Sequence, residues 1–399
     1  MFSLRHAPCA GFFQHLNISL IYNSFRTLTL NPGLYIHVPF CTSKCPYCGF
    51  YSIASYSLVP RWLTALKKEI FHYGGRFDFF DSLYLGGGTP TLLSLGDIEG
   101  ILDSLFKTFT FATNTEITIE ANPGDMSDEK MAGLKSLGFN RINLGVQSFD
   151  DRDLSFLGRK HTTGDAEDAL EKMSLFGFDN VGVDLIYGLE QQTMKGWMKT
   201  LKKALSHRPA HISCYQLTIE KKTPFGKMSD KGLIKPVGEK RAASYFLTTS
   251  AFLEEAGYIH YEISNFAKGI SFYSRHNSKY WQHVPYLGLG PSAHSFQDSK
   301  RWWNISSVRK YCESLEHGKP PIEGIETLTE EQKRMEAVFL GLRTLYGMDI
   351  NKIGNDPVHV KVISQLRDSG HIRVDNGRII PTKKGFLVAD HLPLYFLSE

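Results

Sequence analysis

Three cysteines lie within eight residues of one another in the first part of the chain. Cys41, Cys45 and Cys48 form the pattern C-x3-C-x2-C in the stretch YIHVPFCTSKCPYCGFYS, residues 35–52, and the whole chain has only six cysteines. Thiolates at this spacing bind metal ions or iron–sulfur clusters. Six cysteines, three of them bunched, do not form a disulfide framework and suit a reducing compartment. We therefore expect a cytoplasmic protein that uses these thiols as ligands.

Two kinds of metal centre suit three clustered thiols. A structural zinc ion needs four ligands that close a tetrahedron; the other candidates are His37, which we expect the strand to point away, and three distant cysteines. A [4Fe–4S] cluster is usually held by four cysteines, so three would leave one iron with an open position. The missing fourth ligand favours the cluster. A zinc-stabilised binding module is kept as an alternative.

Other residues with chemical potential recur at the ends of short apolar runs. They are the glycines of GGGTP (86–90) and the polar residues Glu120, Asn122, Gln147, Asp184, Tyr215 and Gln216. In barrels and open α/β sheets, ligands bind at the carboxyl ends of the strands. Six runs that all end in such residues indicate one shared site.

The elements that position these residues alternate between strand-like and helix-like segments. The strand-like runs cover residues 34–39, 82–88, 116–122, 141–148, 180–188 and 211–217, and helical segments include 60–73, 127–137, 164–176 and 193–206. Such alternation requires right-handed crossovers and a parallel sheet. Six units predict an α/β fold with a partial (β/α)6 TIM-type barrel, although a doubly wound open sheet has the same local pattern.

These motifs resemble the radical S-adenosylmethionine (SAM) superfamily and, within it, the oxygen-independent coproporphyrinogen III oxidase family. The resemblance rests on the cysteine stretch and on YLGGGTPT, ITIEANPGD, RINLGVQSFD, GRKH and VGVDLIYGLEQQT, in this order. It extends from about residue 34 to the C-terminus. In that superfamily the amino and carboxylate groups of SAM complete the open iron. The resemblance thus implies a [4Fe–4S] cluster on Cys41, Cys45 and Cys48, with SAM beside it.

The resemblance also assigns a SAM pocket. Gly87, Gly88 and Thr89 resemble the turn that the methionyl amine of SAM approaches, and glycine permits such close approach. Two tyrosines are expected to lie against the cluster and adenine, and four polar residues to hold the ribose and methionine ends: Tyr35 and Tyr47, then Glu120, Gln147, Arg159 and Asp184. An ion pair at the barrel rim is the alternative interpretation for Glu120 and Asp184.

Two branches of this family differ just after the third cysteine. The oxidase branch carries a further cysteine, C-x3-C-x2-C-x-C, and Phe50 stands at that position here. This difference matches the heme-chaperone (HemW-like) branch. The resemblance therefore implies a protein that binds heme and passes it to an acceptor protein, with cluster and SAM regulating the transfer.

The heme-chaperone branch also has a motif, H-N-x-x-Y-W, that is assigned to heme. The stretch RHNSKYWQHVPYLGLGPSAHSF, residues 275–296, contains it at His276, Asn277, Tyr280 and Trp281. Imidazole is a common axial ligand of heme iron, so His276 is the expected ligand and His294 a second candidate. The alternative is a packing motif in which His276 satisfies buried polar groups.

An oxidase is the alternative function. One electron on the cluster would then cleave SAM to a 5′-deoxyadenosyl radical, which abstracts hydrogen from the propionates of coproporphyrinogen III and releases carbon dioxide. An acidic flavodoxin or ferredoxin would suit the net charge of +4 as electron donor.

Four segments are expected along the chain. Residues 1–32 lack acidic residues and form a poorly ordered extension, 33–258 the barrel, 259–326 an extension with the heme motif, and 327–399 a winged-helix-like domain. From residue 327 onward ten Lys plus Arg stand against nine Asp plus Glu, which argues against nucleic acid. The chain has no apolar run of the ~20 residues that a membrane helix needs.

Overall fold

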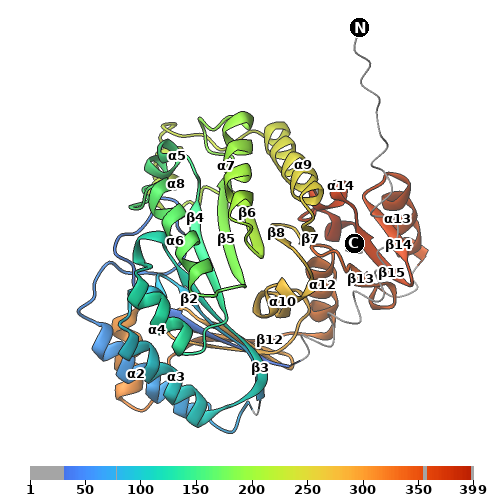
Figure 1. The fold of residues 1–399 in the computed structure, drawn as a ribbon. Helices are drawn as coiled ribbons and strands as arrows, with labels where there is room; N and C mark the ends of the chain where they lie inside the picture. Colours follow the sequence, from blue (N-terminus) through green and yellow to red (C-terminus); the bar gives the residue numbers. More distant parts are fainter. Residues whose placement is uncertain (1–30, 78, 354–356, 397–399) are drawn as a thin grey trace.

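A parallel β-sheet forms the centre of the molecule (Figure 1). The computed structural model describes residues 31–77, 79–353 and 357–396. Six strands lie side by side in the order of the sequence and pair in parallel: β1 (Gly33–Val38), β2 (Phe79–Gly87), β3 (Thr110–Ala121), β4 (Arg141–Gln147), β5 (Val181–Tyr187) and β6 (His211–Gln216). A doubly wound sheet reverses its strand order part-way. The consecutive order therefore confirms the predicted partial (β/α)6 barrel.

Helices connect successive strands and cover the outer face of the barrel (Figure 1). They are α2 (Val59–His72), α3 (Leu95–Thr108), α4 (Asp128–Ser136), α5 (Asp151–Phe156), α6 (Thr163–Leu175), α7 (Met194–Ser206), α8 (Pro224–Asp230) and α9 (Glu239–Glu255). Hydroxyl side chains fix where several begin: Ser94 and Thr162 form capping boxes with Asp97 and Asp165. The helices thus start just beyond the strand ends that carry the polar residues.

The two faces of each strand carry different side chains. On β1, Leu34 and Ile36 are fully buried in the core between sheet and helices. Tyr35 and His37 alternate with them, and their rings lie together on the inner face. The barrel interior is therefore lined by polar and aromatic groups instead of aliphatic ones.

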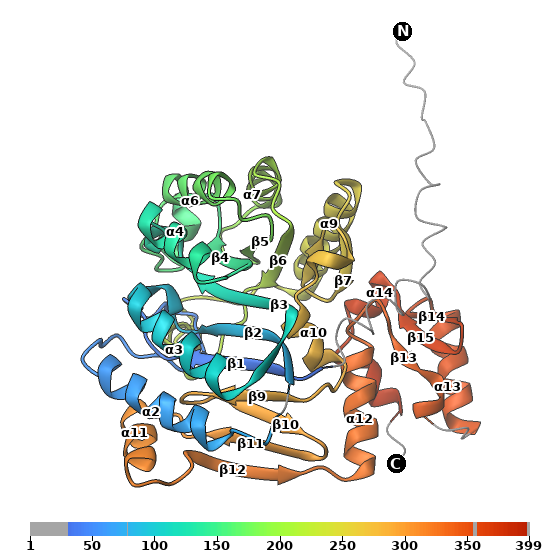
Figure 2. The ribbon, with the colours of Figure 1, turned by 60° about the horizontal axis from the view of Figure 1, so that its bottom comes forward.

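Further strands extend this sheet at both edges. Beside β1 lie β9 (Tyr286–Leu289), which is parallel to β1, and then β10 (His294–Gln297), β11 (Lys300–Asn304) and β12 (Ile322–Thr327), which are antiparallel. Beside β6 lie β8 (Asn265–Ala267) and β7 (Ile259–Glu262). Figure 2 shows the result as one curved sheet. The expected extension, residues 259–326, contributes these strands to the same 12-stranded sheet as the barrel strands.

Helix α10 (Arg275–Trp281) packs against β1 and β2 at the end of the barrel where these strands begin. Its first two backbone N–H groups donate to the carboxylate of Glu116, at 3.2 and 3.1 Å. Lys279 Nζ lies 2.5 Å from Asp81 Oδ1, with both side chains buried. This helix therefore closes one end of the barrel. Helix α11 (Val308–Glu316) packs outside, against α2.

The C-terminal residues form a small second unit with a core of its own. It consists of α12 (Glu330–Gly341), β13 (Met348–Asp349), α13 (Pro357–Asp368), β14 (Ile372–Asp375), β15 (Arg378–Pro381) and α14 (Lys383–Phe386), with β15 between β13 and β14. Asn376 and Gly377 both have positive φ, 49° and 73°, as a two-residue hairpin turn requires. The helices and hairpin expected for a winged-helix-like domain are thus present.

This C-terminal unit touches both edges of the large sheet. It follows β12 directly in sequence. Near β7, the N–H of Leu345 donates to Tyr261 O at 2.8 Å and the N–H of Ile263 to Arg343 O at 3.1 Å. The unit therefore connects one margin of the sheet to the other, as Figure 2 shows at the right.

Two expectations from the sequence concern the chain end and the membrane. The expected extension, residues 1–32, lies outside the described residues except for Asn31 and Pro32. Across the ranges that the structure describes, no helix has the length and apolar character needed to cross a membrane.

Candidate functional site

The loop that follows β1 carries the three cysteines. The N–H of Cys41 donates to Ile53 O at 3.1 Å, which ties the two ends of the loop together, and the N–H of Cys48 donates to Cys45 O at 3.1 Å. All three cysteines are free thiols with partial exposure. Burial raises the pKa of Cys48, and the nearby Cys45 and Cys41 raise it further. The three predicted ligands thus lie in one loop whose two ends are joined.

Side chains from the turn after β2 and from the segment after α5 contact the sulfur atoms. The hydroxyl of Thr89 lies 3.7 Å from Cys41 Sγ, and the N–H of Thr89 donates to Phe40 O at 2.7 Å. Arg159 Nη1 lies 3.6 Å from Cys45 Sγ. A cation or a hydroxyl donor beside sulfur stabilises the thiolate, the form that binds metal. Thr89 and Arg159 therefore support the cysteines as ligands.

The three thiols do not converge on a single point in this structure. No three His, Cys, Asp or Glu side chains in the described part of the chain converge on a point that could hold one ion. In a cubane cluster each thiolate binds a different iron, so the sulfurs need not converge. His37 is buried, and the partners of its two ring nitrogens are not the cysteines. Its Nδ1 lies 3.1 Å from Tyr35 Oη and its Nε2 2.8 Å from Tyr51 O, and burial lowers its pKa to about 4.

Gly87 and Gly88 pass directly beside β1 and the cysteine loop. Gly87 has a φ of 104°, and a Cβ there would lie 2.5 Å from the His37 ring. A Cβ on Gly88 would lie 2.5 Å from Phe40 O. Side chains are therefore excluded at both positions. The turn leaves a bare backbone next to the cysteines, where the sequence predicts the SAM amine.

Two buried carboxylates lie close to each other inside the barrel. Glu120 Oε1 accepts a hydrogen bond from Tyr84 at 2.7 Å and Oε2 one from Gly87 N at 3.1 Å. Burial raises the pKa of Glu120 to about 7, and the charge of Asp184 contributes. Asp184 Oδ1 is buried and has no hydrogen-bond partner among the described residues. An unpartnered buried oxygen beside a second carboxylate fits a cationic ligand with hydroxyl donors, as SAM has.

Gln147 and Arg159 lie on the same rim. Gln147 ends β4 with a φ of 67°, an uncommon conformation that concentrates at functional sites. Arg159 donates to Gly145 O at 2.8 Å and to Asn122 Oδ1. Asn122 in turn donates to the Thr89 hydroxyl at 3.0 Å. Asn122, marked in the sequence only as a polar strand end, therefore links the glycine turn to the arginine that contacts Cys45.

The two tyrosines expected at the cluster occupy different places. Tyr47 lies in the cysteine loop. Burial raises the pKa of its phenol, the neighbouring Arg159 lowers it and Cys45 raises it again. Tyr35 lies deeper, with its ring centroid 6.0 Å from that of Tyr84. Tyr84 itself was not predicted as a site residue. Its inward position on β2, two residues before Gly86, is the signal that would have identified it.

His276 is buried in α10 at the closed end of the barrel. Its Nδ1 lies 3.1 Å from Ser82 Oγ and its Nε2 2.8 Å from Tyr280 Oη. Its ring stacks on Tyr35 at 6.1 Å, and burial lowers its pKa to about 3. Because both ring nitrogens are engaged, neither is open to an iron in this structure. The geometry is that of the packing motif, the alternative that the sequence left open.

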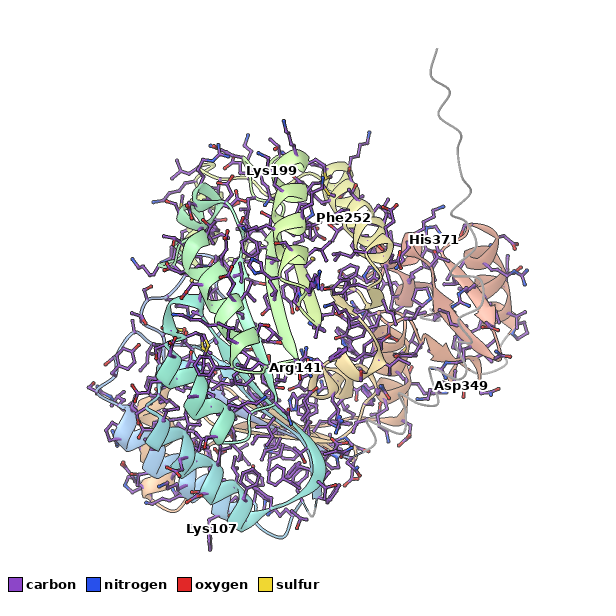
Figure 3. All side chains as sticks on the ribbon, in the orientation of Figure 1. Lys107, Arg141, Lys199, Phe252, Asp349 and His371 are labelled. Atoms are coloured by element: carbon purple, nitrogen blue, oxygen red, sulfur yellow. The ribbon has the colours of Figure 1, made fainter. Side chains whose placement is uncertain are left out.

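One buried arginine lies at the end of the barrel opposite to the cysteines. Arg141, labelled in Figure 3, begins β4 and is fully buried. Its Nη1 donates to Asn180 Oδ1 at 2.8 Å and to Phe272 O at 3.0 Å. It therefore ties the start of the barrel strands to the segment that leads into α10.

A parallel partial barrel with a three-cysteine loop after its first strand and carboxylates in its interior defines the radical SAM class. The family model of the Radical SAM superfamily matches residues 35–204. The solved structure of coproporphyrinogen III oxidase (HemN) from Escherichia coli superposes with a TM-score of 0.77 at 23% identity, over 95% of this chain and 92% of that one. That likeness shows a shared fold.

Sequence similarity to curated proteins is closer. Heme chaperone HemW from Synechocystis sp. is 34% identical over 359 residues, 87% of either chain. Heme chaperone HemW from Bacillus subtilis is 35% identical over 378 residues, 92% of this chain and 99% of that one. The chain belongs to the HemW family. Radical S-adenosyl methionine domain-containing protein 1, mitochondrial, from Mus musculus is 34% identical over 66% of this chain and 60% of its own length.

Proposed function

We propose that this protein binds heme and transfers it to acceptor proteins. The observation that carries the proposal is similarity over nearly the whole chain to proteins named heme chaperone HemW. Phe50 supports it, because it stands where the oxidase branch has a further cysteine and its side chain is 70% exposed. A phenyl group cannot take over the chemistry of a thiol at this position.

In this proposal Cys41, Cys45 and Cys48 hold a [4Fe–4S] cluster and the polar residues beside them hold SAM. When bound, the cluster supplies an open iron and one electron. The residues of the chain bind and position the cluster and SAM. Arg159 stabilises a thiolate, and the bare glycine turn admits the methionyl end. Glu120 and Asp184, together with Gln147, take up the ribose and the positive charge.

The test separates the chaperone from the oxidase. After anaerobic reconstitution to about four irons and four sulfides per chain, the protein is titrated with heme and then mixed with an apo-heme protein. We expect saturable heme binding and loss of heme to the acceptor. In parallel, the protein is incubated with SAM, a reductant and coproporphyrinogen III. Formation of protoporphyrinogen would assign the oxidase activity, and a zinc ion without sulfide would rule out both functions.

The partners and place of action follow from the same proposal. The acceptor would be a protein that requires heme, and a flavodoxin or ferredoxin would be the electron donor. The three free thiols require a reducing environment, which supports the cytoplasm as the place of action.

A further inference from the structure

A second imidazole, close to the cysteine end of the barrel, is open on both nitrogens. His294 begins β10 and its side chain is exposed. Neither ring nitrogen makes a hydrogen bond to any residue that the structure describes, and its ring contact is with Trp303. His276, by contrast, is buried with both nitrogens engaged. Of these two candidates for heme iron, only His294 presents a lone pair to solvent.

Strand pairing places His294 at the cysteine end of the sheet. Strand β9 runs parallel to β1, and β10 runs antiparallel to β9, so β10 begins where β1 and β9 end. Gly288 of β9 is paired with Tyr35 of β1, and a Cβ on Gly288 would lie 2.1 Å from His294 O. The chain leaves β1 directly into the loop of Cys41. His294 and the cysteines are thus at the same end of the sheet.

The exposed imidazole lies on the sheet face that α2 and α11 leave uncovered. His294 pairs with Trp303 across β10 and β11. The preceding residue, Trp302, points to the other face and donates to Tyr73 Oη of α2 at 2.9 Å. Because side chains alternate along a strand, His294 and Trp303 must lie on the opposite face. Tyr35 of β1 also points away from the helices, so this face continues the barrel interior.

Trp303 fixes the orientation of the imidazole. The two ring centroids are 5.9 Å apart, and the planes differ by 24°. The indole occupies the space that a side chain on Gly324 would need, since a Cβ there would lie 2.3 Å from it. An axial imidazole stands perpendicular to a porphyrin plane. An indole stacked on that imidazole would also stand perpendicular to the porphyrin. Its edge would then contact the porphyrin face and cover it with apolar atoms.

We infer that His294 is the axial ligand of the heme that this protein carries, on the face formed by β9–β12 at the cysteine end of the barrel. This inference rests on the proposed function. A ring nitrogen donates its lone pair to the iron and displaces a water molecule, so no proton or electron is transferred. Partial removal of water by the surrounding protein and the charge of Arg301 lower the pKa of His294, which keeps the lone pair available at neutral pH.

The experiment is a heme titration of the full-length protein in four variants. His294→Ala removes the ligand, His294→Cys replaces it by a thiolate, His276→Ala removes the motif histidine, and His317→Ala is the control on an exposed histidine at the end of α11. We expect His294→Ala to weaken heme binding by roughly tenfold or more. His294→Cys should convert the imidazole spectrum to a thiolate spectrum, which a merely structural residue would not do. His276→Ala and His317→Ala should keep the imidazole spectrum.

The outcomes distinguish this inference from the proposed function. A wild-type protein that binds no heme would overturn the proposed function and the inference together. Wild-type binding with an unchanged spectrum and affinity in both His294 variants would overturn the inference alone. Loss of imidazole ligation in His276→Ala, with iron content and melting temperature unchanged, would also overturn it. Iron content and circular dichroism check that each variant is folded.

Discussion

Tyr84 donates a hydrogen bond to Oε1 of Glu120 at 2.7 Å, and Oε2 of the same carboxylate accepts from Gly87 N at 3.1 Å. Both donors come from β2, so the carboxylate of β3 is fixed against the neighbouring strand. Burial nevertheless raises the pKa of Glu120 to about 7. The charge of this carboxylate therefore changes near neutral pH by the gain or loss of one proton.

SAM affinity should rise with pH up to about 7. The positive charge of SAM favours ionised Glu120, and the protonated carboxyl that dominates below its pKa must lose its proton on binding. By linkage the association constant should then increase by up to about tenfold per pH unit below the pKa and level off above it. Calorimetric titration of the reconstituted protein between about pH 6 and pH 8 measures this.

The Glu120→Gln variant is the matched control for that measurement. It keeps the shape of the side chain and removes the titrating proton. Its SAM affinity should be weaker and nearly independent of pH over the same range. A variant with the same pH profile as the wild type would show that another group titrates.

Gly88→Ala should impair cluster loading. The added Cβ would lie 2.5 Å from Phe40 O and 2.8 Å from Val38 O, and backbone atoms cannot move aside without displacing the cysteine loop. We expect lower iron content after reconstitution and a loss of about 1–3 kcal/mol in stability. Gly124→Ala is the control, because a Cβ there meets nothing within 4 Å. Full iron content in Gly88→Ala would contradict this explanation of the turn.

Glu69 is a buried carboxylate that joins α2 to the strand extension. It accepts hydrogen bonds from Gly290 N at 2.8 Å and from the side chains of Asn304 and Tyr311. Burial raises its pKa from 4.5 to about 7. Between these values the folded protein binds a proton that the unfolded chain has lost, so folding stability decreases as pH rises through this window.

Relative to a Glu69→Gln variant, the wild type should therefore lose stability between about pH 4.5 and pH 7 and change little above that range. Urea denaturation of both proteins at a series of pH values measures the difference. Parallel profiles for the two proteins would show that Glu69 remains ionised in the folded state.

Replacing one partner of the Lys279–Asp81 pair should be far more damaging than replacing both. Lys279→Met would leave a buried carboxylate without its cation, at a cost of about 3–5 kcal/mol. The double variant Lys279→Met, Asp81→Leu should recover much of that loss. Thermal denaturation of the two variants tests whether α10 depends on this ion pair, and equal melting temperatures would show that it does not.

The barrel could be predicted because its strands are short apolar runs with polar ends. The sequence did not show where two of these strands begin. Strands β2 and β3 begin at Phe79 and Thr110, earlier than residues 82 and 116. The segment TFATNT (110–115) has no apolar run, and its pairing with β2 arises from position alone.

The cysteines, the glycine turn and the rim residues were predicted because each lies on a local motif. The hydrogen bonds of His276 could not be predicted, because its partner Ser82 is 194 residues away and becomes its neighbour only in the folded chain. The pairing of β9 with β1 is equally remote: YLGL is a four-residue strand whose partner lies some 250 residues earlier. For His294, exposure and the stacked Trp303 depend on strand register, which composition does not encode.

The C-terminal unit is attached to both margins of the open sheet, directly after β12 and through Tyr261 and Ile263 near β7. It therefore acts as a strap across an incomplete ring, and the width of the gap depends on the last seventy or so residues. A change in how this unit packs would therefore alter the spacing of the two margins of the sheet, without touching any residue of the site.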